Sequence, residues 1–468
     1  MIRALPDYSR FYKVLLGAFM LVLLWAPIPL GSNRPWSLAL LELSVFGLLA
    51  LALLRYAFSA ELFAPRRVER YLLASLGLWV LFAALQLLPL PYAIVQVLNP
   101  DVAKVYARLP SVGSAIPLTV DWSTSVTTTL RFTMYAAVFA LTLLLARTRR
   151  RILWTVACVI AACTFEAIYG LTVYLGGDAL GLWDPRFNAD TVAGTYVNRN
   201  HFAGLLVLGL GLAIGLLAVG AGQRFATSRL AQVLDYLMSW PVWVLFAAVC
   251  ICAAVVLSTS RGALAGLVVG IFCAFVLIRR RSRARKRLVA SSLGLAFLAV
   301  TWFGMGSLPG KLVEHGLESN RPDLIASSVE LVRASPWLGG GSGTFRWRFT
   351  AVRDASFGDN FYQHAHNDWL EMVVDLGVIG ALPLFFCIGL AFRTIVAGLR
   401  ERQDILACAV LLGTLISTAA FVVHALVDFN FHIPANAVYF FVCLALGVNA
   451  SSRASFASSR EPKYGYSV

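Results

Sequence analysis

Charged side chains are scarce in this sequence. Asp, Glu, Lys and Arg together make up 13% of its 468 residues, whereas hydrophobic residues make up 59% and the mean hydropathy is +0.75. A typical soluble domain has about 25% charged residues. The shortage of charge therefore excludes a soluble globular fold and indicates a protein embedded in a membrane.

Long apolar runs are what the sequence has in abundance. A bilayer core is about 30 Å thick and takes roughly 20 apolar residues per helix. The fold class expected is all-α, a polytopic integral membrane protein with a large outer loop between its ninth and tenth helices. About twelve transmembrane helices are predicted, near residues 14–30, 36–54, 71–91, 126–146, 152–175, 201–221, 241–257, 262–278, 288–305, 366–392, 403–427 and 433–449.

Acidic residues are the rarer charge, 24 against 39 basic ones, which gives a net charge of +15. Most basic residues fall in alternate loops, the densest being RRRSRARKR from Arg279 to Arg287. Short cytoplasmic loops carry an excess of Lys and Arg, so both termini are predicted to be cytoplasmic. Membrane topology and anionic lipid headgroups account for the charge, and no nucleic-acid partner is expected.

Neither disulfides nor a cleaved signal peptide is expected. All eight cysteines lie inside apolar runs, where small core residues are expected rather than disulfides or a zinc site. The first apolar run is followed at once by another with no small-residue cleavage site, so it is predicted to be a retained helix and not a signal peptide.

Histidine is rare as well, with six in the chain, and two of them share one short segment. The stretch QHAHNDW places His364, His366 and Asn367 at the outer start of the apolar run near 366–392. Polar residues gathered where a hydrophobic helix begins predict a site at the membrane surface.

Two further outer segments are polar. GTYVNRNHFAGLL places Arg199, Asn200 and His201 at the mouth of one span, and LSTSRGALAG places Ser260 and Arg261 at another. A lone arginine at a membrane boundary can simply extend toward lipid headgroups. Two arginines flanked by amides or hydroxyls instead favour a diphosphate ligand, because the guanidinium fork matches phosphate oxygens and stays charged.

The histidine segment resembles the signature of the O-antigen ligase and O-antigen polymerase superfamily of bacterial inner-membrane glycosyltransferases. That signature is His, then Asn, Ser or Gln, nine residues, Gly, two residues, and Gly, Thr or Tyr. His366, Asn367, Gly377 and Gly380 match it in full.

Other features are similar to the same superfamily over roughly residues 190–450. Arg199 and Arg261 resemble its periplasmic arginine pair, although Ala203 stands where some ligases have a leucine. Pro336 and the glycines after it also resemble a family feature.

The resemblance implies transfer of a glycan from undecaprenyl pyrophosphate to an acceptor sugar, lipid A-core, at the periplasmic face during lipopolysaccharide biosynthesis. His366 would be the general base, since histidine can accept a proton near neutral pH. Arg199 and Arg261 would bind the pyrophosphate. Supporting substrate contacts are expected from Asn200, His201, Ser260, His364, Asn367 and Asp428. Because the donor stores the bond energy, no nucleotide, redox cofactor or metal is expected.

Two other functions stay open. A polymerase of O-antigen or exopolysaccharide would use the same donor, with a growing lipid-linked glycan as acceptor. A transporter of lipid-linked glycans would also have about twelve spans, but transporters place polar sites at the bilayer midplane on broken helices.

The expected organisation has five parts. Residues 1–150 form transmembrane helices 1–4, and residues 151–305 form helices 5–9 with the arginine-bearing outer loops. Residues 306–365 form the large periplasmic loop. Residues 366–450 form helices 10–12, and residues 451–468 a cytoplasmic tail.

Several polar residues admit a second interpretation. His364, His366 and Asp368 include the imidazole and carboxylate ligands of a metal site, and His366 could instead serve only to join the loop to a helix. His424 and Asp428, with His432, are four residues apart and would share one face of a continuing helix. Pro434 indicates that the helix ends near there, which would place His432 beyond it. These three residues would brace the last two spans or line an acceptor-sugar groove.

The segment SPWLGGGSGTF, from Ser335 to Phe345, is glycine-rich but lacks the Gly-Lys-Ser/Thr ending of a nucleotide phosphate loop. It is predicted to form tight backbone turns.

Overall fold

The computed structural model describes residues 10–58, 65–110, 113–176, 181–182, 191–218, 239–278, 321–353, 357 and 361–456. Within these ranges the chain is helical apart from one small antiparallel sheet of β1 (Leu90–Pro91) and β2 (Ala115–Ile116). The expected all-α membrane fold is confirmed.

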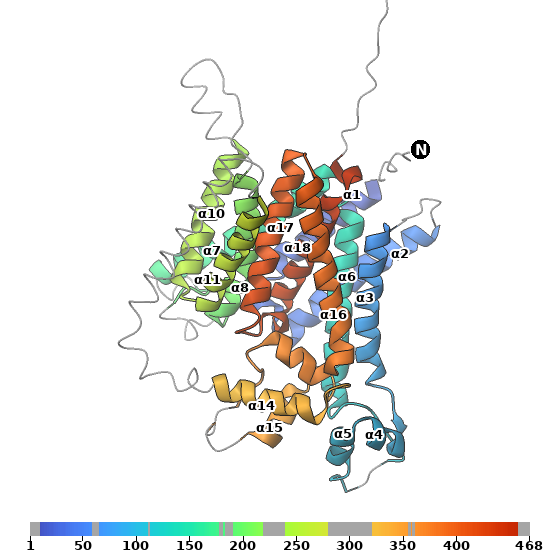
Figure 1. Cartoon of the computed structure of the whole chain (residues 1–468). Coiled ribbons are helices and arrows are strands. Elements are labelled where there is room, and N and C mark those ends of the chain that lie inside the picture. The colour runs from blue at the N-terminus through green and yellow to red at the C-terminus, as the bar shows by residue number, and fades with distance from the viewer. Residues whose placement is uncertain are drawn as a thin grey trace, which may run out of the picture.

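Nine helices of the described ranges are long and apolar enough to cross a membrane. They are α2 (Pro35–Phe58), α3 (Arg67–Leu85), α6 (Trp122–Leu145), α7 (Arg149–Gly176), α8 (Arg199–Leu217), α10 (Trp240–Leu257), α16 (Asp368–Glu401), α17 (Ile405–His424) and α18 (Pro434–Ser451). The shorter α1 (Arg10–Trp25) and α11 (Arg261–Ile278) join the same bundle (Figure 1). Every predicted span except that near 288–305 coincides with one of these helices, and that span lies outside the described residues.

Three helices form the centre of the bundle. Almost every residue of α8, α17 and α18 is buried. Helices α2, α3 and α10 instead expose large apolar side chains such as Leu43, Leu78 and Trp243. An exposed apolar exterior around a buried centre is what a lipid environment requires.

Glycines bring α17 close to two of its neighbours, α11 and α8. A Cβ added at Gly266 of α11 would meet the carbonyl oxygen of Ala420, and one added at Gly215 of α8 would meet the backbone of Gly413. Small residues at such contacts let helix backbones approach closely in membranes. The same contact continues to Gly262, where a Cβ would meet the ring of His424. Helix packing therefore fixes the position of the last residue of α17.

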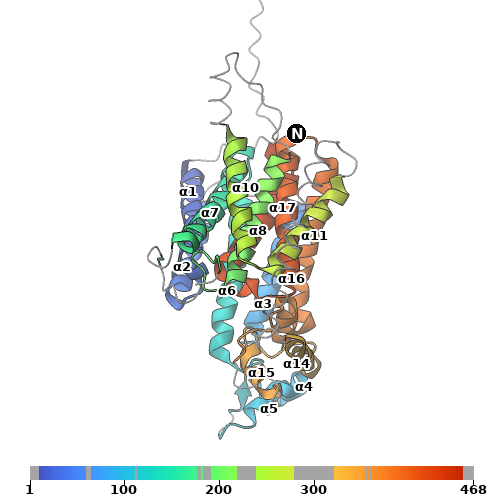
Figure 2. The same ribbon diagram turned by 90° about the vertical axis from the view of Figure 1, so that its left-hand side faces the viewer.

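An outer module covers one end of the bundle (Figures 1 and 2). It contains α4 (Tyr92–Leu98), α5 (Pro100–Tyr106), α14 (Arg321–Ala334) and α15 (Phe345–Val352). Elsewhere the described residues also form the short helices η1 (Leu30–Ser32), η5 (Asn430–His432) and η6 (Arg453–Phe456). Phe345, Phe349 and Tyr362 pack with Val374 of α16 in an apolar core. The module is thus built on the start of α16.

The glycine-rich segment of this module makes the predicted tight turns. Gly339, Gly341 and Gly343 all have positive φ, which glycine adopts without a Cβ penalty. The carbonyl of Gly340 accepts a hydrogen bond from the Val120 N–H at 3.0 Å, and the segment lies against α16. These turns join the 90–121 and 321–365 parts of the outer module.

The opposite end of the bundle carries basic residues of the predicted cytoplasmic loops. The buried carboxylate of Glu69 pairs with Arg66, and also with Arg147 at 2.8 Å. Arg66 also donates to the Asn449 side chain at 2.9 Å, which joins α3 to α18. This polar network therefore ties α3 to the ends of α6 and α18.

The glycine contact of α11 with α17 leads to a stability prediction. Gly266→Ala forces a methyl group against the Ala420 carbonyl, and we expect overpacking to destabilise the protein by about 1–3 kcal/mol. Gly47→Ala is the matched control, because no atom lies within 4 Å of a Cβ added there. The midpoint of thermal unfolding of the purified variants tests this; equal midpoints would show that the close contact does not stabilise the fold.

Candidate functional site

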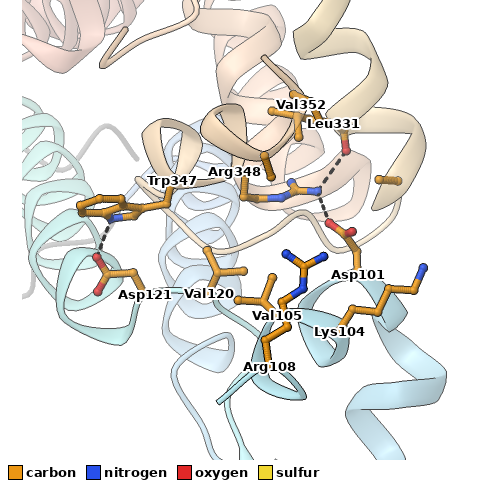
Figure 3. A pocket seen from close by; sticks show the side chains of 12 residues that line it. Asp101, Lys104, Val105, Arg108, Val120, Asp121, Leu331, Trp347, Arg348 and Val352 are labelled. Atoms are coloured by element: carbon orange, nitrogen blue, oxygen red, sulfur yellow. Dashed lines mark hydrogen bonds and ion pairs between the residues drawn. The ribbon is translucent and has the colours of Figure 1, made fainter. Parts of the chain in front are cut away.

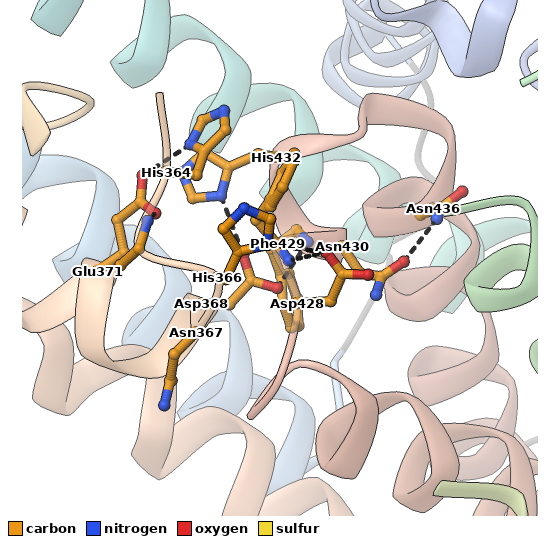
Figure 4. A network of polar contacts seen from close by, with 12 residues as sticks. His364, His366, Asn367, Asp368, Glu371, Asp428, Phe429, Asn430, His432 and Asn436 are labelled. Carbon is orange, nitrogen blue, oxygen red and sulfur yellow. Dashed lines mark hydrogen bonds and ion pairs between the residues drawn. The ribbon is translucent and has the colours of Figure 1, made fainter. Parts of the chain in front are cut away.

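Five of the six histidines meet at the outer end of the central helices, and Figure 4 shows His364, His366 and His432 among them. His201 comes from the first turn of α8, His364 and His366 from the segment before α16, His424 from the end of α17, and His432 from η5. The sixth, His315, lies outside the described residues. Helices far apart in sequence thus supply one site.

Asp428 is the carboxylate around which three of these rings gather. It is 2% exposed, and its oxygens lie 3.4 Å from His201 Nε2, 3.6 Å from His424 Nε2 and 3.9 Å from His366 Nδ1. Burial opposes ionisation, but His201 and His424 outweigh it and hold the pKa of Asp428 well below its usual range. Asp428 is therefore an anion at neutral pH.

Phe429, the next residue, packs against three of the histidines. Its ring centroid lies 4.4 Å from that of His201 and 4.9 Å from that of His366, both edge-on, and it stacks on His364 at 4.5 Å. One aromatic side chain thereby limits the movement of three imidazoles.

A second polar network lies on the other side of Phe429. His432 Nδ1 is 2.9 Å from Asp368 Oδ1, and His432 Nε2 is 3.1 Å from Glu371 Oε1. His364 Nδ1 lies 2.8 Å from the same Glu371 oxygen. The second Glu371 oxygen accepts from the Ala365 N–H at 2.7 Å. This network fixes the segment that carries His366.

The two contacts of His432 determine its charge. An imidazole with a carboxylate at each nitrogen must donate from both, which makes it an imidazolium. Burial disfavours that charge, but Glu371 and Asp368 raise the pKa of His432 to about 10. By contrast, burial outweighs Glu371 at His364 and lowers the pKa of that residue to about 4. One fixed cation and one neutral imidazole stand side by side.

These contacts bear on the alternative of a metal site. His364, His366 and Asp368, the set considered from sequence, do not converge, because they contact Glu371, Asp428 and His432 respectively. His364, Glu371 and His432 do bring ligand atoms within 4.8 Å of one another. A metal ion there would have to displace the Nε2 proton that His432 donates to Glu371.

The backbone around His366 explains how its side chain is presented. The helix was expected from residue 366, but α16 begins at Asp368 with Asn367 as its N-cap, whose side chain accepts from the Leu370 N–H at 3.1 Å. His366 itself has φ of 50°, a left-handed conformation uncommon outside glycine. His364 and His366 thus lie in a turn, not on one helix.

The motif glycines serve packing. At Gly377 the helix is interrupted, with φ of 64°, and the N–H groups of Val378 and Ile379 donate to the carbonyls of Pro336 and Trp337. A Cβ at Gly380 would collide with Phe82 of α3. The signature therefore couples the histidine to the docking of the outer module.

Both candidate arginines begin helices at this end of the bundle. Arg199 is the first residue of α8, two before His201, and Arg261 is the first of α11, beside the Gly262 that contacts His424. Helix N-termini favour anions, because their first N–H groups are unpaired and the helix dipole is positive there. Two cationic side chains and two helix N-termini thus lie at the edge of the histidine cluster.

Several buried polar atoms at this end make no hydrogen bond within the described residues. They include Ser260 Oγ, Thr259 Oγ1, Asn430 Nδ2 and His424 Nδ1. Thr259 also has φ of 56°, which is strained for a β-branched residue. Buried polar groups are normally paired, so this end of the bundle has capacity for polar groups of a ligand.

The predicted residues are thus partly brought together. His201, His364, His366 and Asp428 are in contact through Phe429 or directly, whereas Asn367 caps α16 and its side chain points away from the histidines in Figure 4. Asn200 lies in the first turn of α8, where its N–H donates to Asn198.

His424, Asp428 and His432 do not share a helix face. The chain leaves the helix before His432, as Pro434 indicated, because α17 ends at His424 and His432 lies in η5. Sequence reasoning missed Glu371 and Phe429. Glu371 follows Asp368 by three residues in the first turn of α16, a spacing that could have identified it.

The charge on His432 leads to a pH prediction. Its folded pKa of about 10 exceeds the unfolded value of about 6.5. The native state therefore keeps a proton that the unfolded state releases, so this contribution to stability is complete below pH 6.5 and is lost as the pH rises toward 10. We expect thermal stability to fall over this window in wild type and to fall less steeply in His432→Gln. His364→Gln is the control that should keep the wild-type slope, and equal slopes in all three proteins would contradict the assignment.

Residues 246–385 match the family model described as O-antigen ligase. That range includes Arg261, His364, His366 and Glu371 and ends before Asp428. The match confirms the resemblance inferred from the histidine motif and supports an O-antigen ligase- or polymerase-type function, as expected of a glycosyltransferase-like membrane enzyme. No curated protein matches the chain.

Proposed function

We propose that this multi-pass enzyme transfers a glycan from undecaprenyl pyrophosphate to an acceptor sugar, as an O-antigen ligase with lipid A-core as acceptor. The observation that carries the proposal is the placement of His366 beside the Asp428 anion, at the end of the bundle where Arg199 and Arg261 begin their helices. A base and a set of anion-binding groups are the two things this reaction needs from a protein.

His366 acts as the base. Its side chain is 28% exposed, so a substrate hydroxyl can reach the ring. An Asp428 oxygen lies 3.9 Å from His366 Nδ1, so its negative charge favours a positive charge on the ring. As the acceptor oxygen attacks the anomeric carbon, its proton passes to His366. Asp428 stabilises the resulting imidazolium.

Arg199 and Arg261 act on the leaving group. When the bond from the anomeric carbon to the phosphate oxygen breaks, negative charge grows on the pyrophosphate. Two guanidiniums and the N-termini of α8 and α11 offset that charge. The Ser260 hydroxyl, which has no hydrogen-bond partner within the described residues, supplies a further donor.

The placement of the cluster also supports an enzyme over a transporter. Five histidines gather with Asp368, Glu371 and Asp428 at the outer end of the central helices, whereas a transporter site lies near the bilayer midplane. Basic residues at the opposite end support an orientation in the inner membrane with cytoplasmic termini and a periplasmic site.

A polymerase would use the same base and the same pyrophosphate site with a second lipid-linked glycan as acceptor. Transfer assays with purified lipid-linked donor and either lipid A-core or a second donor molecule as acceptor distinguish the two. Ligation to lipid A-core is the outcome we expect.

His366→Ala tests the base. We expect turnover to fall by about 10²–10⁴-fold, the range for loss of a positioned base, while donor binding stays near wild type. His364→Ala should be milder, since His364 contacts Glu371 and not Asp428. Wild-type turnover should persist in EDTA. If EDTA abolishes turnover and a divalent ion restores it, a metal held by His364, Glu371 and His432 replaces the base in the mechanism.

Arg261→Ala tests the pyrophosphate contact. Loss of a charge-assisted contact should cost about 1.5–3 kcal/mol, roughly ten- to hundredfold in kcat/KM for the donor, with little change for the acceptor. Arg261→Lys should recover only part, because an ammonium keeps the charge and loses the fork. Arg34→Ala is the matched control, an exposed arginine ahead of α2. Full activity of Arg261→Ala at normal protein levels would remove Arg261 from the site.

A further inference from the structure

A cavity of about 440 Å³ lies in the outer module, between α5 on one side and α14 and α15 on the other (Figure 3). Pockets that bind small molecules fall between about 300 and 1,000 Å³. The cavity is separate from the histidine cluster, and the mechanism above does not use it.

Its wall is joined to the start of α16. Arg348 lines the cavity, is 4% exposed, and donates to the Val374 carbonyl at 2.9 Å, three residues after Glu371. The other Arg348 nitrogen pairs with Asp101 at 2.8 Å and donates to the Leu331 carbonyl at 3.2 Å. The cavity therefore lies at a fixed position on the outer side of the histidine cluster.

The two carboxylates that line the cavity already have partners within the protein. Asp101 is neutralised by Arg348. Asp121 accepts from Trp347 Nε1 at 2.7 Å and from the Thr124 N–H at 3.1 Å. Partial burial opposes ionisation of Asp121, but these hydrogen bonds and Arg346 lower its pKa. Neither carboxylate is left to bind a cation.

The remaining charge of the lining is positive. Lys104 and Arg108 are exposed and have no side-chain partner within the described residues, and Figure 3 shows the Arg108 guanidinium directed into the cavity. Val105, Val120 and Val352 supply an apolar surface, and the indole of Trp347 stands at one edge. Apolar surface beside free guanidinium and ammonium donors suits a sugar ring bearing an acidic group.

We infer that this cavity binds an anionic sugar unit, a uronate or sugar phosphate, of a glycan on the donor or the acceptor. The inference rests on the proposed function, because an enzyme that transfers a glycan holds sugar units beyond the reacting one. Lys104 and Arg108 favour the anionic sugar unit over a neutral one. Arg348 holds the cavity at a fixed position relative to the histidine cluster.

Ligand-detected saturation-transfer NMR on the purified full chain tests the binding. The probes are glucuronate, galacturonate and glucose 6-phosphate, with glucose and galactose as neutral partners. We expect at least one acidic probe to bind, about tenfold more tightly than its neutral partner, and Arg108→Gln combined with Lys104→Gln to remove that preference. Arg333→Gln is the matched control, an exposed arginine of α14 that does not line the cavity. Binding of none of the acidic probes, or binding unaffected by the double substitution, overturns the inference.

Transfer kinetics identify the source of the sugar and separate this inference from the proposed function. The double substitution should raise KM about tenfold for the donor if the site holds donor glycan, or for the acceptor if it holds acceptor glycan, with kcat retained. His366→Ala should lower transfer by about 10²–10⁴-fold and leave probe binding intact. Probe binding by a wild-type protein without transferase activity would reject the proposed function alone. Unchanged KM for both substrates would reject the subsite alone.

Discussion

A buried carboxylate needs partners, and the pairing of Asp428 is the constraint on which the site depends. An unpaired charge away from water is costly, so the fold must bring compensating groups to Asp428. It does so with imidazoles from three segments, the start of α8, the turn before α16 and the end of α17. The glycine contacts of α17 with α8 and α11 set those segments at the required spacing. Packing at the centre of the membrane bundle therefore determines the placement of the histidines at its outer end.

The two polar networks balance their buried charges in different ways. His432 stays charged between Asp368 and Glu371, so it balances two carboxylates and carries no lone pair for proton transfer. The histidines around Asp428 lie 3.4, 3.6 and 3.9 Å from its oxygens and share a single negative charge. Phe429 stands between the networks and holds rings of both in place.

The sequence predicted the spans well because hydropathy and helix length act locally. Eighteen to twenty apolar residues form a spanning helix wherever they occur, so each predicted span in the described residues has its helix. The role of Asp428 was harder, because its partners lie as far away as His201. Four-residue spacing implies a shared face only while the helix continues, and α17 ends at His424, so His432 lies beyond the helix as Pro434 indicated. The cavity beside Arg348 joins residues near 101 to residues near 348, which no local pattern reveals.

The break in α16 links the outer module to the chemistry. Because Gly377 leaves the helical conformation, the carbonyls of Pro336 and Trp337 can take the N–H groups of Val378 and Ile379. The same turn region supplies the Gly343 N–H that donates to Asp375 at 2.6 Å. Arg348 adds its hydrogen bond to Val374 one residue earlier. The glycine-rich segment and α15 are therefore hydrogen-bonded to the turns of α16 that follow Asp368 and Glu371. A displacement of the outer module would move these two carboxylates, which orient His364 and His432. Gly377 and Gly380, eleven and fourteen residues after His366, therefore influence the site through the packing of α16, although neither glycine contacts the site.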